Sequence, residues 1–116
     1  YSGTVAELIH DYMRPQENGT RTDVRWARLT DADGRGLLIT DTGGTLLYVS
    51  VWPYSLDDLE RARHSHELHR REYVTVNIDY RMRGVGGDLP GMLVLKDRYK
   101  LRKGEEYWYR FSLKRL

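Results

Sequence analysis

Short apolar or alternating runs recur along this chain, and turn-forming dipeptides separate them about every 8 to 12 residues. Asn18-Gly19, Asp33-Gly34 and Gly43-Gly44 are the clearest turns, because Gly and Asn tolerate positive φ. The runs between the turns are rich in β-branched and aromatic residues, as strands are. They predict strands at residues 24–29, 36–40, 46–52, 73–82, 92–95 and 107–113. The chain is therefore expected to be all-β, with the strands forming an antiparallel β-sandwich.

Two of these runs alternate strictly enough to assign their faces. In residues 74–82 the even-numbered positions are apolar and the odd-numbered positions are polar. In residues 107–113 the odd-numbered positions are apolar, which places Trp108 on the opposite face with polar neighbours. Trp26 and Trp52 are expected in ordinary core or sheet-surface packing. Trp108 is the exception, because an indole on a wet face is free to stack on a sugar ring.

Residues 55–66 are the exception to the β pattern. Pro53 closes the preceding strand, Ser55 is a good N-cap, and Asp57 and Asp58 stand where a helix N-terminus favours negative charge. Apolar residues recur at helical spacing over this stretch, but the stripe they form is narrow. The sequence thus predicts one short helix, packed on the outside of the sandwich.

Length and charge set limits on the function. The 116 residues suffice for a single domain, residues 1–116. The 19 Lys and Arg and the 17 Asp and Glu are interspersed, with a net charge of +2, which argues against a nucleic-acid or membrane surface. No apolar run reaches the roughly 20 residues of a membrane helix, and the absence of Cys excludes disulfides and thiolate metal sites. Because Tyr1 is not Met, we expect an interior or C-terminal piece of a longer protein.

His64, His66 and His69 form the histidine cluster of the sequence, and imidazole is the commonest metal ligand among side chains. A continuous helix would spread the three around its axis at about 0°, 200° and 140°, so they would converge only if the helix ended near His64. No Asp or Cys stands nearby as a further ligand. We therefore expect surface imidazoles near a helix end and predict no metal site.

Glu17 and Asn18 allow two interpretations. Their side chains either cap a turn or belong to a buried hydrogen-bond network that fixes the loop. We favour the network, because Arg14, Arg21 and Arg25 stand close enough in the sequence to pair with Glu17. Glu17, Asn18, Arg14 and Arg25 are the predicted members of this structural network.

Several motifs are too particular in order and spacing for generic strand or turn chemistry. They are Tyr12-Met-Arg-Pro-Gln-Glu-Asn-Gly19, Asn77-Ile-Asp79, Gly84-Val-Gly-Gly-Asp88 and the aromatic residues 107–111. Together they resemble the C-terminal domain of the large family 2 β-galactosidases, over nearly the whole chain. The resemblance implies a supersandwich of the galactose mutarotase type, with residues 1–116 as the C-terminal part of the small-chain domain (domain 5).

The resemblance also implies a role. In that family two glutamates on a separate barrel domain hydrolyse terminal β-D-galactosides with retention. Neither lies in the matched region, so we predict no catalytic residue and no turnover by this chain alone. The implied role is an accessory domain that buttresses the barrel and borders its sugar site, with the rest of the glycosidase and a galactoside or other carbohydrate as partners. Mg²⁺ and a monovalent cation would be bound in other domains of a cytoplasmic or periplasmic bacterial enzyme.

The expected border of the sugar site comprises Asp88, Leu89, Gly91 and Trp108. The resemblance places the loop that begins at Gly84 near the mouth of the barrel, where the family has a tryptophan platform for the leaving-group sugar. In this sequence Gly91 stands at about that position. From the residues alone, the glycines of the loop indicate a long β connection that uses positive φ.

Two other classes of function are left open. An independent carbohydrate-binding module would need an ordered aromatic platform on an exposed face. Single-strand nucleic-acid binding is weaker, because acids interrupt the basic residues. Without its parent domains the chain would expose sheet edges or apolar faces, so we also expect a homodimer, with residues 5–13 as the first participant.

Overall fold

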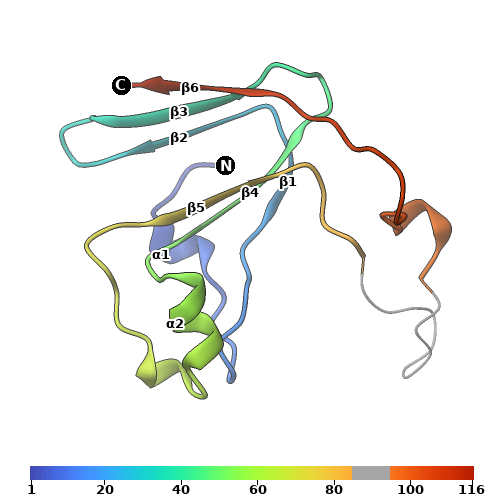
Figure 1. Cartoon of the computed structure of the whole chain (residues 1–116). Helices are drawn as coiled ribbons and strands as arrows, with labels where there is room; N and C mark the ends of the chain where they lie inside the picture. Colours follow the sequence, from blue (N-terminus) through green and yellow to red (C-terminus); the bar gives the residue numbers. More distant parts are fainter. Residues whose placement is uncertain (85–94) are drawn as a thin grey trace.

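The computed structural model describes residues 1–84 and 95–116. In this part of the chain six strands form two three-stranded sheets, in the orders β1-β4-β5 and β2-β3-β6, and all neighbouring strands are antiparallel. Figure 1 shows the sheets one above the other, with α2 beneath the β1-β4-β5 sheet. The predicted all-β class is confirmed. The elements are α1 (Val5–Leu8), β1 (Arg21–Val24), β2 (Trp26–Thr30), β3 (Gly36–Asp41), β4 (Leu47–Trp52), α2 (Leu56–Arg61), η1 (Ser65–Glu67), β5 (Thr75–Asp79), η2 (Asp97–Tyr99) and β6 (Phe111–Arg115).

The core lies between the sheets and is centred on β3 and β4. Ile39 of β3 and Leu47 of β4 are fully buried, and Val49 and Val51 continue the apolar face of β4. Alternation along a strand explains this spacing, since every second side chain points to the same face. The partly buried side chains packed against this core are Val5, Leu8, Val24, Ala27, Leu29, Leu37, Val76, Ile78 and Phe111.

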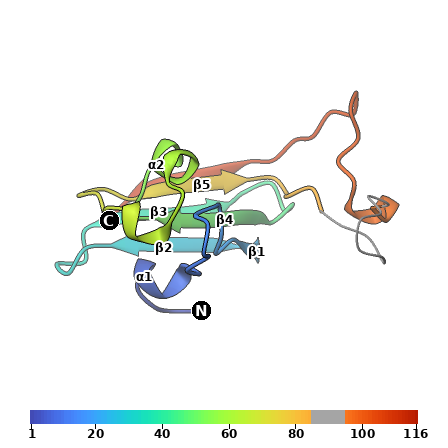
Figure 2. The ribbon, with the colours of Figure 1, turned by 90° about the horizontal axis from the view of Figure 1, so that it is seen from below.

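The opposite face of β4 is covered as well. Ser50 and Trp52 alternate with the core valines and are also buried. Asn77 of β5 donates its side-chain amide to the Ser50 hydroxyl at 3.0 Å, and α2 buries Leu59. Seen from below, α2 lies over this side of the molecule (Figure 2). Strand β4 is thus the central strand of the molecule, because it is covered on both faces.

The apolar run at residues 24–29 is two strands, and the prediction of one strand is wrong. β1 ends at Val24, β2 begins at Trp26, and they belong to different sheets. Asp23 has a positive φ of 56° where the chain leaves the first sheet. Hydrophobic periodicity indicates which positions face a core, but it does not indicate which sheet supplies the hydrogen-bond partners.

The last two strands also differ from their predicted bounds. β5 covers Thr75–Asp79 rather than residues 73–82, and β6 covers Phe111–Arg115 rather than residues 107–113. β6 begins where its partner ends, because Phe111 pairs with Asp41, the last residue of β3. Of the strand predicted at residues 92–95, Leu95 is not in a strand, and the other three positions lie outside the described residues.

The helix prediction is right in its start and wrong in its end. Ser55 accepts a hydrogen bond from the Asp58 backbone N–H, and the Asp58 carboxylate accepts one from the Ser55 N–H, so α2 begins with a capping box. The helix stops at Arg61 rather than at His66, because Ala62 adopts an extended conformation (φ −67°, ψ 130°). A second short helix, α1, was not predicted; Thr4 and Glu7 cap it in the same way.

Two of the three predicted turns join strands. The β2–β3 hairpin contains Gly34 at φ +81°, and Gly44 has φ +76° where the chain crosses from β3 to β4. Asn18-Gly19 does not join two strands: it precedes β1, and the Gly19 backbone lies against the Leu8 carbonyl. A side chain at position 19 would collide with that carbonyl, so glycine is needed there for a close approach between backbones.

Residues 80–84 and 95–110, hereafter the arm, leave the sandwich. Both ribbon views show the arm extending to one side of the molecule (Figures 1 and 2). The radius of gyration is 16.1 Å, whereas a compact domain of this length has about 13 Å. The described part of the chain contains no helix that is long and apolar enough to cross a membrane.

Candidate functional site

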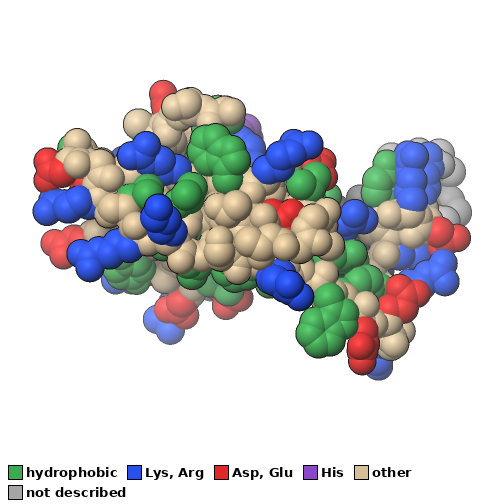
Figure 3. Space-filling model, turned by 90° about the horizontal axis from the view of Figure 1, so that it is seen from above, with side chains coloured by type: hydrophobic (Ala, Val, Ile, Leu, Met, Phe, Trp, Pro, Cys, Tyr) green, Lys and Arg blue, Asp and Glu red, His purple; other side chains and the backbone are tan. Residues whose placement is uncertain are grey.

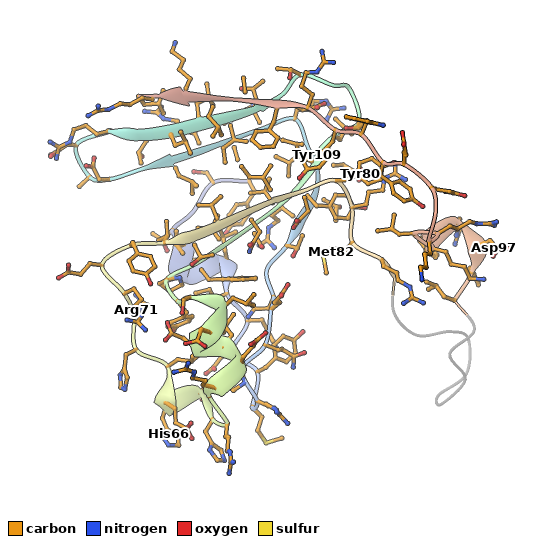
Figure 4. All side chains as sticks on the ribbon, in the orientation of Figure 1. His66, Arg71, Tyr80, Met82, Asp97 and Tyr109 are labelled. Carbon is orange, nitrogen blue, oxygen red and sulfur yellow. The ribbon has the colours of Figure 1, made fainter. Side chains whose placement is uncertain are left out.

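The base of the arm is a cluster of tyrosines. The ring of Tyr80 lies 5.4 Å from that of Tyr107 and 6.2 Å from that of Tyr109, and Tyr109 lies 5.9 Å from Phe111 of β6. The Tyr109 hydroxyl donates to the carbonyl of Ile78 at 3.1 Å. Figure 4 shows Tyr80 and Tyr109 side by side where the arm leaves the sheets. These contacts join the two chain segments of the arm to β5 and β6.

Further out, the two segments of the arm stay close together. The Gly84 N–H donates to the Tyr99 carbonyl at 3.0 Å. A Cβ atom at Gly84 would lie 2.9 Å from the Tyr99 Cβ and 3.0 Å from the Leu95 Cδ1, so glycine permits this approach. The Lys100 ammonium lies 2.7 Å from Asp97, and this hydrogen bond, first among its causes, lowers the pKa of Asp97. The residues that flank the predicted sugar-site loop are thus held beside each other.

Trp108 is the predicted sugar-border residue that lies within the described residues. Its side chain is 78% exposed, and its Nε1 donates to the Glu106 carboxylate at 3.3 Å. An exposed indole face beside a carboxylate offers an apolar platform and a hydrogen-bond acceptor for hydroxyl groups. Asp88, Leu89 and Gly91, the other predicted border residues, lie outside the described residues.

The neighbouring Tyr107 is held in place by polar contacts. Its hydroxyl accepts the Arg102 N–H at 2.6 Å and donates to Glu105 at 2.9 Å. Desolvation raises the pKa of Tyr107, the Arg102 N–H lowers it, and the hydrogen bond to Glu105 raises it, with a net upward shift. The phenol therefore stays neutral, and its role is to fix the turn that precedes Trp108.

The predicted network around Glu17 and Asn18 is arranged around Asn18. Its side-chain oxygen accepts the His10 N–H at 2.8 Å, and its amide donates to the Gln16 carbonyl at 2.9 Å. The Asn18 backbone carbonyl accepts a hydrogen bond from Trp52 Nε1 at 2.8 Å. Glu17, Arg14 and Arg25 are exposed, and within residues 1–84 and 95–116 Glu17 forms no ion pair with an arginine. Sequence reasoning missed Trp52 and His10, for which no local signal exists.

The histidines lie on the helical side of the molecule. Because α2 ends at Arg61, His64 and His66 leave the helix and come together with Glu67 at η1. His69, the third member of the predicted cluster, is exposed and is not part of this group. The sequence allowed the imidazoles to converge only if the helix ended near His64. The helix ends at Arg61, and two of the three imidazoles converge.

The pKa shifts of carboxyl groups in the described residues have one direction. Four carboxyl groups of the described residues have a shifted pKa, and all four shifts are downward: Glu7, Asp58, Glu67 and Asp97. A glycosidase acid needs the opposite shift, produced by burial without a cationic partner. A cavity of about 40 Å³ between residues 9–18 and α2 has room for a few waters only, well below the roughly 300 Å³ of small ligand pockets.

The domain is thus an antiparallel two-sheet unit with an exposed aromatic arm, and comparison with known proteins assigns it. The chain belongs to the β-galactosidase small chain family, whose model matches residues 1–113. It is 39% identical over its whole length to a β-galactosidase of Priestia megaterium and 30% identical over its whole length to one of Halalkalibacterium halodurans, covering 11% of each. It is 34% identical, over 87% of its length, to the β-galactosidase BgaC of Bifidobacterium adolescentis, covering 10% of that protein.

Proposed function

We propose that this chain is an accessory β-sandwich domain of a longer β-galactosidase, where it buttresses the catalytic barrel and borders its galactoside site. The similarity to β-galactosidases over the whole chain supports this role. The chain spans only about a tenth of the length of these relatives, 10–11%. Hydrolysis of terminal β-D-galactosides would therefore be an activity of the longer protein.

The arm is the observation that carries the proposal. It extends from the sandwich, and several of its large side chains are exposed, including Met82 (52%), Tyr99 (49%) and Trp108 (78%). Figure 4 shows Met82 where the chain passes from the sandwich into the arm. Apolar side chains exposed together on a projecting segment are typical of a surface that contacts another domain. The arm also flanks the loop that carries the other predicted border residues, so it is the part of the domain we assign to the sugar site.

The chemistry is assigned to other domains of the longer protein. A retaining glycosidase needs two carboxyl groups about 5 Å apart, one with a raised pKa. Among the described residues, every carboxyl group with a shifted pKa has a lowered one. The Mg²⁺ and the monovalent cation are likewise assigned to other domains. We expect this chain alone, at high concentration with a chromogenic galactoside, to give only the buffer rate. A signal abolished by substituting Glu17 or Asp88 would contradict that expectation.

A chimera tests the accessory role. The β-galactosidase of Priestia megaterium is made in three forms: complete, without the region that matches this chain, and with this chain in place of that region. We expect the complete form and the chimera to be active and the shortened form to be inactive. A shortened form as active as the complete one would refute the buttressing role.

The border role is tested within the active chimera. Trp108→Ala should raise KM for galactosides with little change in thermal stability, because the indole is exposed and contributes little to the core. Trp26→Ala is the matched control, since Trp26 is a 63% exposed tryptophan on β2. Equal effects of the two substitutions on KM would remove Trp108 from the sugar site.

The second candidate, an independent carbohydrate-binding module, is favoured by the contact between Trp108 and Glu106. Titration of the chain with galactose and lactose, followed by tryptophan fluorescence, distinguishes the two roles. Saturable binding lost in Trp108→Ala would support the module, whereas the accessory role predicts no saturation by the chain alone. Nucleic-acid binding gains no support from the surface: Lys and Arg are spread among other side chains on the face seen in Figure 3.

A further inference from the structure

Three side chains that can bind a metal ion, His64, His66 and Glu67, come together at the turn that follows α2. α2 ends at Arg61, His64 has an extended backbone (φ −138°, ψ 152°), and Ser65–Glu67 form the 3-10 turn η1. Both ribbon views place this turn at the opposite side of the molecule from the arm, and Figure 4 shows His66 there, far from Asp97. The site is therefore separate from the proposed sugar border.

The geometry of η1 explains the convergence. Residues three apart are eclipsed in a 3-10 turn, so Glu67 lies over His64, and its carboxylate is 2.9 Å from the His64 Nδ1. The His66 ring stacks on the His64 ring, with centroids 5.4 Å apart and planes 16° from parallel. One ligand atom from each of the three side chains lies within 4.8 Å of the others.

We propose that His64, His66 and Glu67 bind a divalent transition-metal ion of the zinc class. Two imidazole nitrogens and one carboxylate oxygen form a ligand set that zinc uses, with bonds of about 2.0–2.2 Å and a fourth position left for water. Ligand atoms around such an ion are about 3.3 Å apart, as follows from tetrahedral geometry at these bond lengths. All three side chains are exposed, so they are free to rotate from their present spacing, within 4.8 Å, to that separation.

The surroundings prepare the carboxylate for this role. The second oxygen of Glu67 accepts the backbone N–H of Arg63 at 3.0 Å, which orients the carboxylate as outer-shell contacts do in metal sites. His66 also lines an open hollow of about 430 Å³, together with Ser65 and Arg70, which leaves access for water or a further ligand.

The ligand set also predicts selectivity. Imidazole suits zinc, nickel and copper, whereas magnesium and calcium require oxygen ligands. Two of the three ligands here are nitrogen, so magnesium should bind no better to this chain than to a chain without the histidines. His69 is exposed like His64 and His66 but does not belong to the group, and it therefore provides a matched control.

The test uses the 116-residue chain without an affinity tag. Titration with ZnCl₂ in a calorimeter should show one saturable site, and Co²⁺ should give the visible absorption of a four-coordinate complex. His64→Gln, His66→Gln and Glu67→Gln should each weaken zinc binding by about tenfold or more, and His69→Gln should leave it unchanged. Far-UV circular dichroism and melting without metal confirm that each variant is folded.

Three results would overturn the assignment. The first is the absence of saturable zinc binding by the folded chain. The second is an equal loss of affinity in His69→Gln and His66→Gln, which would indicate non-specific binding to surface imidazoles. The third is zinc binding that equimolar Mg²⁺ abolishes, which would indicate an oxygen-ligand site elsewhere.

Discussion

Replacing Trp52 by Phe should destabilise the fold by about 2–4 kcal/mol. Trp52 is 2% exposed, and its Nε1 donates to the Asn18 carbonyl at 2.8 Å. Phe removes the donor and leaves that partly buried carbonyl without this partner, at a cost of about 1–3 kcal/mol. The smaller ring also loses buried apolar atoms, which costs about 1 kcal/mol more. Since domains of this kind are stable by about 5–15 kcal/mol, the loss is readily measured.

The assay is urea denaturation followed by far-UV circular dichroism, because tryptophan fluorescence would change with the substitution itself. The free energy of unfolding and the m-value are fitted together, since a change in the midpoint at constant m reports stability alone. Trp26→Phe is the matched control, because Trp26 is 63% exposed on β2. We expect its free energy of unfolding to stay within about 0.5 kcal/mol of the original chain.

Two outcomes would refute the reasoning. If Trp52→Phe unfolds within about 0.5 kcal/mol of the original chain, neither the hydrogen bond to Asn18 nor the burial of the indole stabilises the fold. If Trp26→Phe lowers the free energy of unfolding as much as Trp52→Phe does, the exposed fraction of the side chain does not determine the loss of stability.

Gly36→Ala should destabilise by about 1–3 kcal/mol in the same assay, because the added methyl would overlap the Leu29 carbonyl of β2; an unchanged midpoint would contradict the predicted collision. The hydrogen bonds from the Arg71 guanidinium are the largest of the causes that depress the pKa of Asp58 well below its usual 3.8, followed by those from Ser55. The stability that this carboxylate contributes is therefore present above about pH 4 and lost as the pH falls below it. Asp58→Asn should flatten the pH dependence of the melting temperature below about pH 4, and parallel melting curves of the variant and the original chain would exclude this contribution. The isolated chain should form dimers at tens of micromolar in sedimentation equilibrium, because its apolar arm and sheet edges are uncovered; a monomeric mass would contradict this.

Local signals in the sequence determined the start of α2 and the turns. The capping box of Ser55 and Asp58 lies within one helical turn, so its residues specify it without help from the rest of the chain. The positive φ of Gly34 and Gly44 likewise depends on glycine alone. The alternation at residues 74–82 also identified the core face of β5, since Val76 and Ile78 pack against the core.

The candidate sites were only partly predictable. The alternation of residues 107–113 placed Trp108 on the polar face and so predicted that it is exposed, and in the structure it is exposed. The convergence of His64 with His66 required the helix to end at Arg61, and the sequence left that end open because apolar spacing continued past it. The partner of Trp52 lies on a segment far away along the chain, so no local pattern could indicate it.

The sequence by itself determined the all-β class, the family motifs, and which residues favour strands, turns and a helix start, because these depend on side chains a few positions apart. Tertiary structure decided which sheet each strand joins. β1 and β2 are nearly continuous in sequence, yet they pair with β4 and β3 respectively. It also decided where β6 begins, since Phe111 is the first residue with a partner on β3. Hydrogen bonds between strands are long-range contacts, and only the folded chain supplies both members of each pair.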